Sequence, residues 1–146
     1  MNDKTFASVH WSFWAIAVVM LLWNVLGSMN LLWQLNADAA QLASFPETHR
    51  AIIEGRPLWA TAGFAIGVIV GALGCILLLL RKSAAYYLFV VSLLGIVVTM
   101  IHTIKIAGMA IEFSQMEVFV MIILPAIVAV FLIWYSTFAK RRNWII

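Results

Sequence analysis

The chain has 146 residues and a formal net charge of +3, with 65% hydrophobic residues, 10% charged residues and a mean hydropathy of +1.05. Soluble domains carry about 45–50% apolar and about 25% charged residues, so this composition excludes a soluble globular protein and indicates a membrane protein. Little of the chain remains once membrane spans are subtracted, which excludes a separate soluble catalytic domain.

Four apolar stretches are long enough to cross the roughly 30 Å hydrocarbon core, which takes about 20 helical residues. They run from about 11 to 35, 58 to 80, 84 to 110 and 118 to 138. The first stretch is too long for the apolar region of a signal peptide, so we interpret it as a retained helix. The expected fold is therefore all-α, an integral membrane four-helix bundle in which residues 1–146 form a single transmembrane domain.

The loop at 36–57 is long enough for structure of its own. Ser44 precedes Glu47 by three residues, Pro46 falls in a first helical turn, and Gly55 ends the segment, a pattern typical of a capped helix. We expect a short amphipathic helix from about Phe45 to Glu54 on the periplasmic side. Its apolar side chains would lie in the headgroup plane or cap the outer mouth of the bundle, and they are Phe45, Ile52 and Ile53.

The second stretch carries glycines that share one helix face, with alanines nearby. Glycine in a membrane helix lets another helix approach closely, so this face predicts helix packing. The partner helix belongs either to the same bundle or to another subunit, and the pattern leaves both open. The packing glycines are Gly63, Gly67, Gly71 and Gly74.

Polar side chains are costly inside a membrane, and here they gather in the outer halves of the first and third stretches. We expect these two stripes to face each other and to line a pocket that opens toward the periplasm and is closed toward the cytoplasm. The candidate ligand-binding residues are Asn24, Asn30, Gln34, Thr99, His102 and Lys105.

Each of these residues also has a structural interpretation. The asparagines could hydrogen-bond between helices, and threonines in helices bond back to their own backbone. His102 has a side-chain type that changes charge near neutral pH, but it could equally be a satisfied core histidine. Lys105 could extend its amine to the membrane surface. Pro125 predicts a loosened backbone near Met121.

Basic residues in short loops predict orientation, because they favour the cytoplasmic side. Most of them fall on one side of the predicted membrane, which places both termini inside the cell. The pI of 9.4 then reflects topology and attraction to membrane lipid headgroups, and no nucleic-acid partner is expected. The basic residues on this side are Lys4, Arg81, Lys82, Lys140, Arg141 and Arg142.

Several chemistries are disfavoured by simple counts. The single cysteine, Cys75, excludes an internal disulfide and the paired thiols of thiol oxidoreductases. The three histidines are too scattered for a membrane haem, and no ligand spacing suggests a zinc site. We therefore expect no cofactor, no metal and no enzymatic activity.

Several segments also carry a family resemblance: Leu21–Gly27, Pro57–Ile66, Gly71–Lys82 and Trp134–Ser136. With these segments the whole chain resembles an uncharacterised family of small four-span bacterial inner-membrane proteins, some of which carry the automatic label sugar transporter. The resemblance implies the same membrane and weakly supports transport.

Two functions follow as hypotheses. The first is a protein, functioning as a homo-oligomer, that binds or passes a small polar, sugar-like solute through the periplasm-facing pocket. The second is a non-catalytic accessory or scaffold subunit whose glycine face docks onto a larger membrane complex. The polar pocket makes the first the leading hypothesis, and the stripe of packing residues keeps the second as the alternative.

Overall fold

The computed structural model describes residues 8–109 and 112–146. Within these residues the regular structure is helical, and four helices are long and apolar enough to cross a membrane. The prediction of a helical protein with four candidate spans is therefore confirmed. The first span is α1 (Trp11–Asn36) and the third is α6 (Ala85–Ala107). The second span consists of α4 (Leu58–Ala65), the π-helical η1 (Ile66–Val70) and α5 (Gly71–Leu79). The fourth span consists of α7 (Gln115–Val118), the π-helical η2 (Phe119–Ile123) and α8 (Leu124–Arg141).

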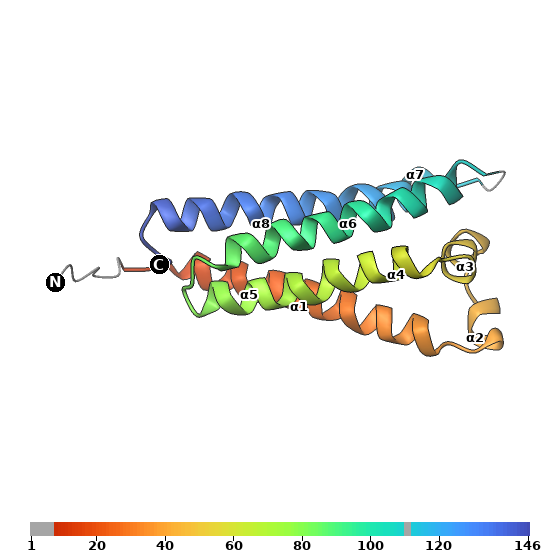
Figure 1. The fold of residues 1–146 in the computed structure, drawn as a ribbon, viewed down its shortest axis with the longest axis horizontal. Coiled ribbons are helices and arrows are strands. Elements are labelled where there is room, and N and C mark those ends of the chain that lie inside the picture. The colour runs from red at the N-terminus through yellow and green to blue at the C-terminus, as the bar shows by residue number, and fades with distance from the viewer. Residues whose placement is uncertain (1–7, 110–111) are drawn as a thin grey trace.

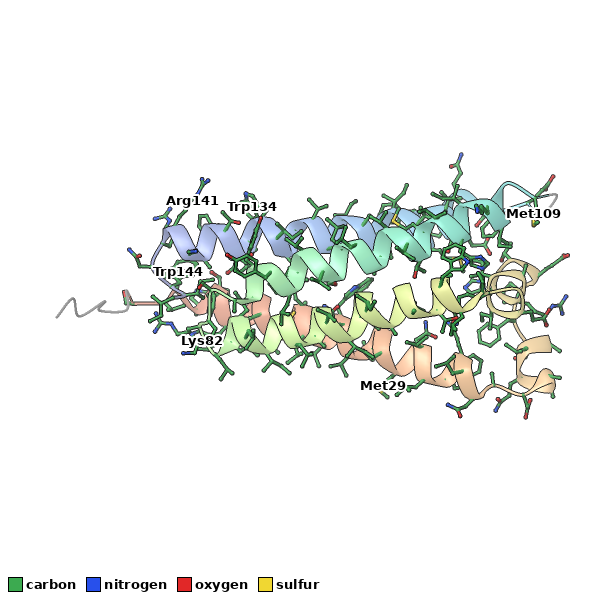
Figure 2. All side chains as sticks on the ribbon, viewed as in Figure 1. Met29, Lys82, Met109, Trp134, Arg141 and Trp144 are labelled. Atoms are coloured by element: carbon green, nitrogen blue, oxygen red, sulfur yellow. The ribbon has the colours of Figure 1, made fainter. Side chains whose placement is uncertain are left out.

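The spans pack in chain order, with α1 on the second span, the second span on α6, and α6 on the fourth span. Figure 1 shows α1 beginning and α8 ending at one end of the bundle, which we call the terminal end. The short helices α2 (Ala39–Ala43) and α3 (Glu47–Glu54) lie at the opposite end, which we call the α3 end (Figure 1). Figure 2 places Lys82 and Arg141 at the terminal end and Met109 at the α3 end.

The terminal end is closed by a packed core. Phe13 of α1 is fully buried and stacks on Tyr135 of α8, with 6.3 Å between the ring centroids. The C-terminal residues fold back over this core, because Ile146 N donates to Arg81 O at 2.9 Å and Ser83 N donates to Ile146 O at 2.8 Å. Ile145 is buried beneath them. These contacts leave the helices tightly packed at the terminal end.

The glycines of the second span are buried inside this bundle. A Cβ on Gly63 would lie 2.8 Å from a Val98 side-chain carbon, and one on Gly67 would lie 2.6 Å from Ile96. Gly71 faces Asn24 and Ser92, and Gly74 faces the Phe89 ring. The predicted glycine face therefore packs against α1 and α6 of the same chain, and it is not an external surface.

Both interrupted spans contain one π-helical turn. Pro125 lies in the first turn of α8, and the π-helical residues of η2 precede it. Proline lacks an amide hydrogen and clashes with the carbonyl of the residue four positions before it, here Met121, and local π turns relieve such a conflict in membrane helices. The predicted loosening of the backbone near Met121 is confirmed.

The loop between the first two spans differs from the prediction in its cap. Gly55 ends α3 as expected, but Pro46 is the N-cap residue of α3 and no side chain caps the helix. Ser44 instead ends α2, where its hydroxyl donates to Gln41 O. The capping box belongs to α2, since Asp38 Oδ1 accepts from Gln41 N and Gln41 Oε1 accepts from Asp38 N. The predicted Ser44 cap is therefore wrong because Ser44 is used by the preceding helix.

Candidate functional site

The four spans line a partly open cavity of about 430 Å³, which we call the α3-end cavity. All four spans and α3 contribute to its wall, and the lining is mostly apolar. Both π-helical turns border it, through Gly67 and Val68 of η1 and Val120 and Met121 of η2. Because π turns frequently occur at functional sites, their presence in two walls of one cavity draws attention to it.

Four of the six predicted ligand-binding residues line this cavity. Asn24, Asn30 and Gln34 come from α1 and Thr99 comes from α6, so the two polar stripes do border one space. The lining does not include His102 or Lys105. Their positions on α6 turn them toward α3 and α4.

His102 connects α6 to α3, which covers the α3 end of the bundle. It is 4% exposed, and its Nε2 donates to the carbonyl oxygen of Ile52 in α3 at 3.2 Å. Its ring meets Trp59 edge-on at 6.1 Å. Lys105 Nζ lies 5.8 Å from the centroid of Trp59 on the exposed side of α6. These contacts give His102 and Lys105 structural partners that sequence spacing does not reveal.

The polar groups at the inner part of the cavity bond within the protein. Asn24 Nδ2 donates to Met20 O at 2.9 Å and lies 3.8 Å from Cys75 Sγ of the second span. Ser92 Oγ donates to Gly67 O, and Thr99 Oγ1 donates to Ala60 O at 2.9 Å. The Asn24 bond to Met20 lies within α1, whereas the Cys75 contact and the Ser92 and Thr99 bonds join neighbouring spans, as membrane polar groups often do.

The polar groups at the α3 end of the cavity are less completely hydrogen-bonded than those at its inner part. Within the described residues, three buried atoms that belong to lining residues have no hydrogen-bond partner: Gln34 Oε1, His49 Nδ1 and Arg56 Nε. They come from α1, from α3 and from the segment before α4. Buried polar atoms are nearly always paired in folded proteins, so an unpaired group of this kind calls for an explanation such as a bound molecule.

Arg56 carries the charge of this group. Its guanidinium lies 5.4 Å from the centroid of the Phe64 ring, and no acidic side chain pairs with it in residues 8–109 or 112–146. Burial lowers the pKa of Arg56, because an apolar environment disfavours the charged form. Because this half-buried cation has no anionic partner among the described residues, its position favours a negatively charged ligand.

Sequence reasoning missed His49 and Arg56 as lining residues. Arg56 directly precedes Pro57 and the apolar second span, near the end of the loop at 36–57. The sequence signal that could have found Arg56 is its position next to a span. A charged side chain at such a position can face either water or the interior of the bundle. Only the placement of α3 across the bundle decides between the two.

A buried hydrogen bond fixes α3 to the fourth span. Thr48 is 7% exposed, and its hydroxyl donates to Glu117 Oε1. The other oxygen of Glu117 accepts from the amide and hydroxyl of Ser114, which forms the N-cap of α7. His49 Nδ1 lies 3.9 Å from Glu117, which is too far for a hydrogen bond. The cavity therefore has a roof that is tied to both α6 and the fourth span.

The part of the chain that the structure describes contains no group of three His, Cys, Asp or Glu side chains close enough to hold a metal ion. Comparison of the chain with protein families, with curated proteins and with solved structures finds no match. The resemblance to a four-span family therefore stays a prediction.

Proposed function

We propose that this chain is a multi-pass membrane protein that binds a small organic molecule in the α3-end cavity. The observation that carries the proposal is the combination of a cavity of about 430 Å³ with three buried polar atoms at one end that have no hydrogen-bond partner within the described part of the chain. Small-molecule sites typically have volumes of about 300–1,000 Å³, mostly apolar walls and a few convergent polar groups. The α3-end cavity meets each of these criteria.

The chemistry of the lining favours a ligand with an apolar body and one polar end over a sugar-like solute. Asn24, Ser92 and Thr99 already bond to protein atoms, and most of the remaining wall is apolar. A sugar would leave many of its hydroxyls without partners in such a wall, at considerable free-energy cost. Binding is also better supported than passage, because the packed core around Phe13 and Tyr135 blocks the terminal end.

We propose the bacterial inner membrane as the location, with the terminal end at the cytoplasmic face. The basic residues at that end support this orientation under the positive-inside tendency. The α3-end cavity would then lie in the periplasmic half of the bilayer. The accessory-subunit hypothesis needed an exposed glycine face, and the internal packing of Gly63 and Gly67 removes that support.

The test is to look for a bound small molecule and to fill the space that would hold it. Ala129 lines the α3-end cavity and is 6% exposed, so Ala129→Phe places a ring inside it. Ala126→Phe, on the outer surface of the same helix, is the matched control. Native mass spectrometry of the purified protein should show an adduct on the wild type and on Ala126→Phe, but not on Ala129→Phe. Adducts on all three proteins, or on none, would contradict the proposal.

A further inference from the structure

The α3-end cavity has an opening toward the bilayer. Its rim on the side between α1 and the fourth span is formed by side chains that are themselves exposed, namely Trp23 at 40%, Leu26 at 63% and Val120 at 47%. These residues lie in apolar spans, where exposed surface faces lipid. A molecule could therefore enter the cavity sideways from the membrane without crossing the roof formed by α3.

The cavity also has the length of one leaflet. Asn24 lies at its inner end and Gln34 at its α3 end, and ten residues of helix correspond to about 15 Å. The hydrocarbon core is about 30 Å thick, so each leaflet contributes about half of that. Its axis thus follows the direction of a lipid chain from the headgroup region to the bilayer centre.

The cavity is wide enough for an extended hydrocarbon chain. A volume of about 430 Å³ over about 15 Å gives a mean cross-section of about 29 Å². An extended hydrocarbon chain is one methylene wide and fits a channel of this section.

The polar groups at the α3 end of the cavity indicate which lipid headgroup would bind there. Arg56 Nε is a buried donor on a cation, and Gln34 Oε1 is a buried acceptor that needs a donor from the ligand. An anionic phosphate satisfies the first and a free hydroxyl satisfies the second. A zwitterionic choline headgroup supplies no hydroxyl and brings its own cation close to Arg56.

Resting on the proposed function, we infer that the α3-end cavity holds one acyl chain of a membrane glycerolipid whose anionic, hydroxyl-bearing headgroup is bound by Arg56 and Gln34. The second chain of the lipid remains in the bilayer outside the opening between α1 and the fourth span. The polar end lies at the start of the second span, which is the depth of the headgroups.

The test is a lipid competition on the full chain. The protein is placed in nanodiscs that contain equal amounts of phosphatidylglycerol and phosphatidylcholine, and the lipids that stay bound are counted by native mass spectrometry. Charge-assisted hydrogen bonds make a preference of about tenfold for phosphatidylglycerol the expected result for the wild type. Arg56→Gln should abolish the preference, and Arg56→Lys, which keeps the charge, should retain most of it.

Arg50→Gln is the matched control, because it removes a cation from the same end of the bundle at a residue that does not line the cavity. It should leave the preference unchanged. Equal retention of both lipids by the wild type, an unchanged preference in Arg56→Gln, or the same loss in Arg50→Gln would overturn the inference. A dimer that Ala129→Phe abolishes would also overturn it, by showing that a second copy fills the space.

The two proposals fail differently. In one case the wild type carries an adduct that Ala129→Phe removes, but the adduct is not phosphatidylglycerol or is unchanged by Arg56→Gln. Binding in the cavity is then supported and the lipid inference is wrong. If Ala129→Phe changes no adduct at all, the proposed function itself falls.

Discussion

Gly95 of α6 lies directly against the backbone of the second span, so Gly95→Ala should destabilise the bundle. A Cβ at Gly95 would lie 2.6 Å from Gly63 O and 2.6 Å from Gly67 N. Ordinary Cβ contacts begin at 3.4 Å. Both obstructing atoms are backbone, which cannot rotate away, and therefore α6 and the second span must separate by close to 1 Å.

The size of the effect follows from what this separation breaks. Overpacking of a well-packed core costs about 1–3 kcal/mol. The movement also stretches the bonds from Ser92 Oγ to Gly67 O and from Thr99 Oγ1 to Ala60 O. Interhelical bonds in membranes average about 0.6 kcal/mol each, which brings the loss to about 2–4 kcal/mol. Alanine has a higher helix propensity than glycine by up to about 1 kcal/mol, which leaves a net loss of stability of about 1–3 kcal/mol.

The assay is reversible unfolding in detergent micelles with increasing SDS, followed by tryptophan fluorescence. Gly108→Ala is the control, because a Cβ at Gly108 would meet its nearest atoms at 3.5 Å and 3.6 Å, which are ordinary contacts. Gly95→Ala should unfold at a lower SDS fraction than the wild type, and Gly108→Ala should not. Equal midpoints for the two variants would refute the close packing of α6 on the second span.

Two further predictions concern the ends of the bundle. Thr48→Val removes the donor to Glu117 Oε1 and should weaken the attachment of α3 by about 1–2 kcal/mol. The backbone amides of residues 47–54 should then exchange hydrogen faster. Thr61→Val, which removes only a bond within its own helix, should leave this exchange unchanged. Equal protection of these amides in both variants would contradict the role of the Thr48–Glu117 hydrogen bond. Asn143 has φ 56°, so Asn143→Val should cost about 1–2 kcal/mol in SDS unfolding while Asn143→Gly is tolerated. Equal stability of the two Asn143 variants would contradict that backbone conformation.

The spans could be predicted from the sequence because each depends on about 20 consecutive apolar residues, a signal that needs no knowledge of neighbours. The same holds for the polar stripe of α1, since residues such as Asn30 and Gln34 share a face by helix geometry alone. Their hydrogen bond, from Gln34 Nε2 to Asn30 Oδ1 at 3.2 Å, is of this local kind.

Features that depend on contacts between distant segments could not be predicted. Gly95 is a single glycine in its span and gains its meaning from Gly63 and Gly67, which are far away in the sequence. His102 was expected in the pocket because of its chemistry, but its partner is a backbone carbonyl of α3. Arg56 lines the cavity because α3 folds across the end of the bundle, and the sequence pattern offered that placement only as one of two positions for this helix.

The most direct test of the central claim is a density map of the protein in nanodiscs that contain phosphatidylglycerol, at a resolution that shows side chains. We expect elongated density in the α3-end cavity, running beside α1 from Gln34 toward Asn24 with its polar end at Arg56. A seam in which α1 packs directly against the fourth span, with no space between them, would contradict the claim that this protein has a ligand-binding cavity.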